Sequence, residues 1–200
     1  SKEVGAKIRY VFEHKQGIAH ARNRAINECR HFTYLAFIDA DEIPSKNWLQ
    51  SAIHSLEHEK ADCVGGKIKL DLPIKPPKWL TNDIKGFLGY LDHGDKGFII
   101  TSSDTPIWTG NIAYRINIFH DNPTPFDIRY NRAGNGVGGG EDKILLETLL
   151  KNNFRIYYTP EMIISHIIPP EKIKRQYFLK LHYQSGKKNG RFSFTNFSRS

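Results

Sequence analysis

Three carboxylates stand directly after an apolar run near the start of the chain. The run is Tyr34 to Ile38, and the acids are Asp39, Asp41 and Glu42. A continuous apolar run is typical of a strand buried on both faces of a parallel sheet, and ligands of such sheets gather at the carboxyl ends of the strands. Mg²⁺ and Mn²⁺ prefer oxygen ligands, so Asp39 and Asp41 are candidate metal ligands. The same acids could instead cap the following helix or stay solvated.

A second group, Gly17, Arg22 and Asn23, lies at the start of a predicted helix. Backbone N–H groups at a helix start, together with an arginine, attract an anion. A glycine lets the ligand approach the backbone closely. This group is a candidate phosphate site, although an ordinary exposed arginine on a first helical turn would look the same.

A third group, Glu141 and Asp142, follows three glycines at the start of another predicted helix. A helix N-terminus favours ionised carboxylates, so Asp142 could serve as a general base. Acids there also stabilise a helix by about 0.3–1 kcal/mol each, without any catalytic role.

Farther on, His166 follows a short apolar run. Such a histidine is usually a core residue, but an imidazole can also complete a metal site that carboxylates share.

The order of these motifs resembles that of family 2 glycosyltransferases with the GT-A fold. Gly-x-x-x-Ala-Arg-Asn, Asp-x-Asp-Glu, Trp-x-Gly-Asn, Gly-Gly-Glu-Asp and a histidine shortly before proline follow one another between about residues 10 and 185. The resemblance implies transfer of a sugar, with inversion, from a nucleotide diphosphate donor of the UDP type. The acceptor would be a hydroxyl of a glycan or a lipid-linked molecule, and Mn²⁺ or Mg²⁺ would be the cofactor. Synthesis of glycans, polysaccharides or cell-surface glycolipids is the implied setting.

The resemblance also implies a role for each candidate residue. Asp142 would be the catalytic base, with Glu141 beside it. Asp41 would bind the metal ion with Asp39 and His166. The remaining residues would bind the donor (Gly17, Arg22, Asn23 and Asp39) or contact the sugar and the acceptor (Trp108, Gly110 and Asn111).

The predicted fold class is α/β, a GT-A-type, Rossmann-like, mostly parallel sheet flanked by helices. We expect strands at Ile8–Phe12, Tyr34–Ile38, Cys63–Leu70 and Arg155–Thr159, the last stopped by Pro160. A first βαβ unit would span the first two of these strands. Helices are expected at Ile18–Arg30, from Pro44 and Ser45 to about Lys60, at Glu141–Lys151 and at Ile173–Ser185.

The expected domain organisation is a partial glycosyltransferase domain at 1–185 and a basic, aromatic tail at 186–200. Residues 71–105, rich in proline and glycine, are predicted to be an irregular insertion on the acceptor side. Members of this family normally begin with a strand, a turn and a helix that hold the nucleotide base. Nothing before Ile8 can supply them, so we expect that the chain lacks its first βα units and is itself inactive.

Composition narrows the class of protein. Hydrophobic residues make up 39% and charged residues 25% of the 200 positions, which excludes disordered and fibrous chains. No apolar run approaches the roughly 20 residues of a membrane helix. Two cysteines, Cys29 and Cys63, cannot form a disulfide framework and suggest buried thiols in a reducing compartment. We therefore expect a cytoplasmic protein, peripheral on the inner face of the membrane.

Most of the net charge of +8 lies at the end of the chain. Residues 171–200 hold eight basic residues and one acid. Interleaved aromatic residues make an anionic membrane surface a candidate partner, and we expect no nucleic acid. A solvated last helix with a frayed end would have the same composition.

Other readings of the sequence compete with sugar transfer. Gly134 to Gly139 spells a dinucleotide fingerprint, and Glu161 follows at the distance of a ribose-binding acid. An oxidoreductase would, however, meet the charges of Glu141 and Asp142 where the pyrophosphate should lie. A non-catalytic module that binds membranes or nucleic acid would not need acids at strand and helix ends. A glycosidase would use two carboxylates without explaining Arg22.

Overall fold

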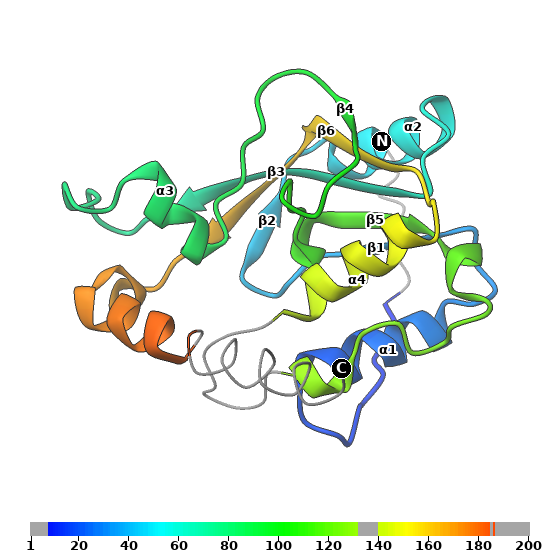
Figure 1. The fold of residues 1–200 in the computed structure, drawn as a ribbon, viewed down its shortest axis with the longest axis horizontal. Coiled ribbons are helices and arrows are strands. Elements are labelled where there is room, and N and C mark those ends of the chain that lie inside the picture. Colours follow the sequence, from blue (N-terminus) through cyan, green and yellow to red (C-terminus); the bar gives the residue numbers. More distant parts are fainter. Residues whose placement is uncertain (1–7, 132–139, 185, 187–200) are drawn as a thin grey trace, which may run out of the picture.

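The structure is a computed structural model that describes residues 8–131, 140–184 and 186. Within these residues, six strands form one sheet with helices beside it (Figure 1). Five strands follow one another in the order β1 (Tyr34–Phe37), β5 (Ile112–Arg115), β3 (Cys63–Asp71), β6 (Ile156–Ile167) and β2 (Glu42–Pro44). The sixth, β4 (Phe98–Ile100), also pairs with β6.

The strand pairing corrects the expectation of a mostly parallel sheet. Among the described strands, β3 and β6 pair in parallel, while the pairs β1–β5, β3–β5, β2–β6 and β4–β6 are antiparallel. An apolar run such as Leu35 to Phe37 indicates burial, but burial does not fix the direction of the neighbouring strand. Here β5 comes between β1 and β3 and reverses the direction.

Helix α1 (Ile18–Glu28) and helix α4 (Glu141–Lys151) confirm two predicted helices. Gly17 precedes α1 with a φ of 135°, in the left-handed region that favours glycine. Residues 175–184 are helical, as the prediction for the last helix required. The prediction for α2 (Trp48–His58) began too early, because Pro44 ends the edge strand β2 and the helix starts only after a turn.

Two strand predictions were wrong. Pro160 does not stop β6, which continues to Ile167, because the β3–β6 register shifts where Pro160 lies and the proline needs no ladder hydrogen bond there. Residues 8–13 form no strand. Ile8 and Tyr10 are 94% and 83% exposed, and no described strand pairs with them. The expected first βαβ unit is therefore not formed by the described residues.

The apolar side chains gather in two clusters. The main cluster joins the sheet to the helices, with Leu56 from α2 and Leu145 from α4 among its members. A second, smaller cluster joins residues 80–88 to the segment after β6, through Leu80, Leu88 and Phe178 among others. Part of the predicted insertion at 71–105 is therefore fastened to the final helical segment. The insertion contains α3 (Asn82–Lys85), a 3₁₀ turn at Gly86–Leu88 and β4.

None of the helices in the described part of the chain has the length and apolar character needed to cross a membrane. Cys63 is buried, Cys29 is half-buried, and both are free thiols. The glycine run Gly134–Gly139 and residues 187–200 of the basic tail lie outside the described residues. The expectations attached to them stay predictions, as does the acceptor role of 71–105.

Candidate active site

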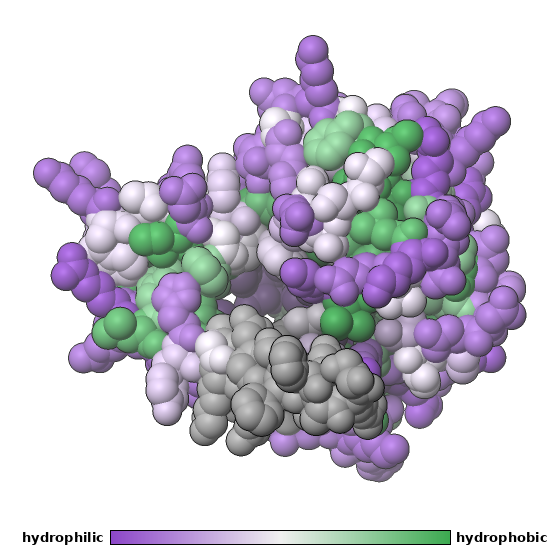
Figure 2. All heavy atoms as spheres, viewed as in Figure 1, coloured by the Kyte–Doolittle hydropathy of each residue, from purple (hydrophilic) through white to green (hydrophobic). Residues whose placement is uncertain are grey.

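A cavity of about 460 Å³ lies where the main body of the protein meets the part fastened by the second cluster. Figure 2 shows the surface hollowed between these two parts. One wall comes from the start of α1, the segment after β1, the end of β6 and the start of α4. The opposite wall comes from residues 86–89 and from 172, 177 and 181. The lining includes most of the predicted site residues: Arg22, Asp39, Asp41, Trp108, Gly110, Glu141, Asp142 and His166.

Arg22 stands at the centre of this cavity's charges. Its Nη1 lies 2.8 Å from Asp142 Oδ1 and 3.3 Å from Glu141 Oε1, and its Nη2 lies 3.6 Å from Asp39 Oδ2. Arg22 is only 5% exposed, and its guanidinium also lies over the ring of Phe126. The alternative of an ordinary exposed arginine is therefore wrong. The structure instead gives one buried cation surrounded by three carboxylates.

Asp142 is held from two directions. The Thr109 hydroxyl donates a hydrogen bond to Asp142 Oδ1, the same oxygen that Arg22 contacts. Asp142 also lies in the first turn of α4, where the helix dipole favours a negative charge. The structure shows no hydrogen bond from a described residue to the other carboxylate oxygen, Oδ2. The Asp142 side chain lines the cavity. This arrangement holds the Asp142 carboxylate in one orientation on the cavity wall.

Asp41 and His166 form a second pair on the cavity wall. His166 Nε2 lies 3.3 Å from Asp41 Oδ2, and His166 Nδ1 lies 2.9 Å from the carbonyl oxygen of Leu88. Because a carbonyl only accepts, Nδ1 must carry a proton and donate it. Nε2 of a neutral imidazole would then be an acceptor, which is the form that binds a metal ion. The β2–β6 ladder brings the pair together, since Glu42 lies opposite His166.

Glu42 is the least solvated carboxylate of the Asp39–Glu42 segment. Burial raises its pKa to about 7, with smaller upward contributions from the charges of Asp39 and Asp41. The hydrogen bond that the Asp39 N–H donates to Glu42 Oε2, at 2.8 Å, and the charge of Arg22 lower that pKa. Glu42 faces Gly110, where any side chain would collide with its carboxylate.

The raised pKa of Glu42 predicts a pH effect on stability. An acid whose pKa is higher in the folded state stabilises the fold below its unfolded pKa, near 4.5, and loses that contribution as pH rises through 7. Glu42→Gln keeps a hydrogen-bond acceptor and removes the titration. We expect the free energy of unfolding of the parent, relative to the variant, to fall by about 2 kcal/mol between pH 4.5 and 8. Denaturant unfolding in a chelator checks this, and a constant difference would contradict it.

Sequence comparison bears directly on this site. The profile of the family described as "Glycosyl transferase family 2" matches residues 2–123, more than half of the chain. The chain belongs to this family. The match includes the segments that carry Arg22, Asp39, Asp41 and the Trp108–Asn111 motif, and it confirms the resemblance predicted from the order of the motifs.

A curated relative and a solved structure are similar to this glycosyltransferase chain. The "Succinoglycan biosynthesis protein ExoM" of Rhizobium meliloti (strain 1021) is 25% identical over 189 residues, which cover 94% of this chain and 57% of the relative. The chain thus spans little more than half the length of that protein. A crystal structure of GalNAc-T7 with UDP, GalNAc and Mn²⁺ superposes with a TM-score of 0.55 at 15% identity, over 78% of this chain and 31% of the other. This likeness confirms the predicted GT-A fold.

Some predicted site residues lie outside the cavity lining of this family 2 chain. The Asn23 side chain bonds both the N–H and the carbonyl of Phe126. Asn111 is 1% exposed; it accepts from the Trp48 indole at 2.6 Å and donates to the carbonyls of Lys67 and Met162. Gly17 packs against Asn131. The structure gives these three residues positions that support the site, and their predicted ligand contacts stay predictions.

The structure also adds residues that the motif analysis did not single out as site residues. Glu42 and Lys143 line the cavity, and each is a direct chain neighbour of a predicted residue. Lys172 adds a third positive charge to the lining, beside Arg22 and Lys143. Thr109 lies inside the predicted Trp-x-Gly-Asn motif, between Trp108 and Gly110. Its contact with Asp142 joins residues 33 positions apart, so no local sequence pattern predicts it. Trp108 lines the cavity, and its indole N–H is buried without a hydrogen-bond partner among the described residues.

The cavity residues fit a divalent cation that takes some of its ligands from water and substrate. No three histidine, cysteine, aspartate or glutamate side chains of the described residues converge closely enough to hold a metal ion alone. Asp41 and His166 nevertheless put a carboxylate and an imidazole side by side on the cavity wall. Mg²⁺ and related ions often bind through one or two carboxylates and take their other ligands from water and substrate phosphates. Asp39, already paired with Arg22, is the third candidate.

Proposed function

We propose that the chain provides the catalytic centre for transfer of a sugar from a nucleotide diphosphate donor to an acceptor hydroxyl, with inversion. One observation carries the proposal. A carboxylate positioned as a base, Asp142, a buried cation, Arg22, and a carboxylate–imidazole pair, Asp41 with His166, line the same cavity. Family membership supplies the class of reaction. The glycine run needed for the alternative, a dinucleotide-binding oxidoreductase, lies outside the described residues and has no support from the comparisons.

Asp142 would accept the proton of the acceptor hydroxyl. As the O–H bond breaks, the oxygen forms a bond to the anomeric carbon and the bond from that carbon to the diphosphate oxygen breaks, so that the diphosphate leaves with the electron pair. A single displacement of this kind inverts the anomeric centre. Thr109 and Arg22 bond Oδ1 of Asp142, which would hold the carboxylate in one orientation for this transfer. Glu141 would share the charge of Arg22 without contacting the acceptor.

The leaving diphosphate gains negative charge, and positive groups stabilise such a group best when they are fixed in place beforehand. Arg22 is fixed by its three carboxylate contacts, and Lys172 lines the opposite wall. Asp41 and His166, with Asp39 nearby, would hold the divalent cation. When bound, that cation would supply Lewis-acid stabilisation of the diphosphate oxygens.

The comparisons suggest which substrates to try first. The solved neighbour holds UDP, GalNAc and Mn²⁺, and the curated relative is named for succinoglycan biosynthesis. We propose a UDP-sugar as donor, Mn²⁺ or Mg²⁺ as cofactor, and a glycan or lipid-linked saccharide of a cell-surface polysaccharide as acceptor. Trp108 and Gly110 would lie near the transferred sugar. Contact of the basic tail at 186–200 with an anionic membrane, and a cytoplasmic, peripheral location, are part of the same proposal.

Because the chain by itself is expected to be inactive, UDP binding and turnover are measured, here and in the later tests, on the intact parent protein, where metal dependence can be tested on both together. We expect chelation to abolish transfer and to weaken UDP binding measured by calorimetry. His166→Ala should raise the Mn²⁺ concentration needed for half-maximal activity at least about tenfold, as expected when an interaction at a metal site is lost. His120→Ala, a change at an exposed histidine outside the cavity lining, is the control. Activity and UDP binding that ignore the chelator would count against the metal site.

A further inference from the structure

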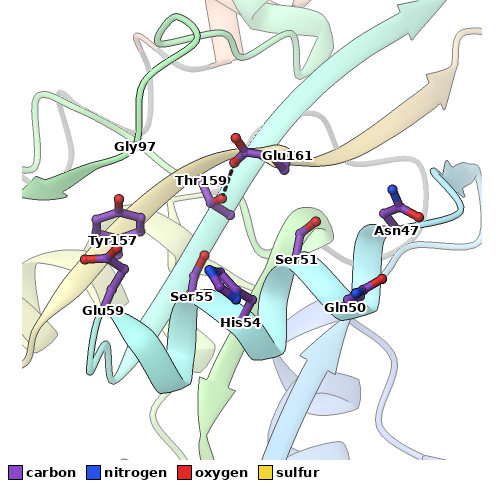
Figure 3. Close-up of a pocket in the computed structure, with 10 residues that line it drawn as sticks. All are labelled: Asn47, Gln50, Ser51, His54, Ser55, Glu59, Gly97, Tyr157, Thr159 and Glu161. Carbon is purple, nitrogen blue, oxygen red and sulfur yellow. Dashed lines mark hydrogen bonds between the residues drawn. The ribbon is translucent and has the colours of Figure 1, made fainter.

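A second groove, unrelated to the cavity around Arg22, lies between α2 and β6. It measures about 460 Å³, as large as the candidate active site, and the two share no lining residue. Two rows of side chains face each other across it. Asn47, Ser51, Ser55 and Glu59 recur every four residues along α2 and its ends, and Tyr157, Thr159 and Glu161 alternate along β6. Figure 3 shows Ser51 and Ser55 pointing from α2 toward the strand that carries Thr159.

The groove is polar at a place where a helix usually packs on a sheet with apolar residues. Ser55 and Thr159 are 3% and 4% exposed and form its deepest part. The Thr159 hydroxyl donates to Glu161 Oε2 at 2.7 Å, which fixes the carboxylate in one orientation. Asn47 precedes α2 but makes no side-chain capping bond to it. These hydroxyl, amide and carboxylate groups leave donors and acceptors facing the groove.

The lining selects a class of ligand by its chemistry. Of the described residues that line the groove, none is lysine, arginine or an aliphatic residue, so a phosphate would lack a cation and a lipid would lack an apolar surface. Glu59 and Glu161 would repel an anion. Amides, hydroxyls and the imidazole of His54 can both donate to and accept from neutral hydroxyl groups, and the carboxylates can accept from them. The ring of Tyr157 adds one flat apolar face. The ligand that matches all of these groups is a neutral saccharide.

We propose that the α2–β6 groove is a second saccharide-binding site, which holds a part of the glycan that does not react. The choice of a saccharide rests in part on the proposed function, since sugar transfer brings glycans to this protein. On β3, the partners of Thr159 and His166 are Gly66 and Leu70, which lie four residues apart, so the groove and the candidate active site are separated by about 13 Å along the sheet. Binding energy from such a remote part of a substrate can improve the use of long acceptors.

The test uses the full chain and defined probes. Hexasaccharides of glucose, galactose and N-acetylglucosamine are titrated separately while backbone amide signals are followed by NMR. We expect saturable shifts at α2 and β6 residues of the groove with at least one probe, and no such shifts with sulfate or Mn²⁺ alone. Ser51→Trp, which fills the groove, should raise the Kd for that probe at least about tenfold. Ile53→Trp on the same helix, at a 39% exposed side chain outside the groove, should leave the Kd unchanged.

A second variant and a second ligand make every outcome decisive. If Ser51→Trp fails to fold, the double variant of the exposed residues Gln50→Ala and His54→Ala should show the same loss of binding. The inference is overturned if none of the three probes shifts the groove signals, if sulfate or Mn²⁺ shifts them instead, or if the groove variants bind as the parent does. UDP binding is measured in parallel. If UDP binds but no saccharide does, this inference alone is refuted. If a saccharide binds in the groove but UDP does not bind, the proposed function alone is refuted.

Discussion

Asp142→Asn should lower kcat for sugar transfer by about 10²–10⁴-fold, the range expected when a general base is lost. The amide keeps the size and the Oδ1 acceptor of the side chain, so the Thr109 and Arg22 contacts can persist. What disappears is the negative charge that takes the proton of the acceptor hydroxyl. Because Asp142 is not assigned to the diphosphate, the Kd for UDP with Mn²⁺ should change by less than about twofold.

The comparison variant for this experiment is Glu147→Gln on the same helix. Glu147 makes a 3.9 Å ion pair with the exposed Lys143 and does not line the cavity. Its kcat and its UDP binding should match those of the parent. Equal losses of turnover and of UDP binding in Asp142→Asn would show that the residue supports donor binding instead of acting as the base.

Arg22→Met should lower the free energy of unfolding by about 3–5 kcal/mol, the range for removing one partner from a buried ion pair. The variant leaves Asp39, Glu141 and Asp142 without the cation that all three approach within 3.6 Å. Methionine fills much of the same space, so the loss would reflect charge more than packing. Denaturant unfolding measures the loss, and UDP binding should weaken in the same variant.

Arg24→Met is the matched control two positions along α1. Its arginine pairs with Glu28 at 2.8 Å, but the Arg24 side chain is 46% exposed, and exposed helix pairs contribute only about 0.3–0.5 kcal/mol. Adding Glu141→Gln to Arg22→Met should recover part of the lost stability, because one of the three carboxylates that Arg22 contacts becomes neutral. Equal stability of the two arginine variants would refute the central role given to Arg22.

The sequence predicted which residues line the cavity better than it predicted the sheet. Helix α4 and strand β3 follow from local apolar patterns, and the motif order led to the residues that line the cavity. The direction of strand pairing depends on which distant strand lies alongside. No local sequence pattern shows that β5 lies between β1 and β3. A proline usually ends a strand because its missing N–H breaks the ladder, but here a register shift between β3 and β6 accommodates Pro160.

Contacts between residues of different motifs also could not be predicted from the sequence. Glu42 was visible in the run of acids, yet its close approach to Gly110 depends on how the strands pack. The Asn111 side chain looked available for a ligand in the motif, and only the fold shows that Trp48, Lys67 and Met162 use it fully. Residue type and spacing thus indicate where chemistry can occur, while the roles of buried polar side chains depend on neighbours far away in the chain.

The length of β6 has a consequence for any polymer that this protein handles. Thr159 and His166 belong to one continuous strand that pairs with β3 on both sides of the register shift. Because β3 pairs with β6 on both sides of this shift, the two positions keep a constant separation, so a short sugar can occupy one position or the other but cannot reach both. A longer chain that spans them gains the second contact at a high effective concentration. The fixed separation of the two positions on β6 would therefore favour long acceptor chains over short ones.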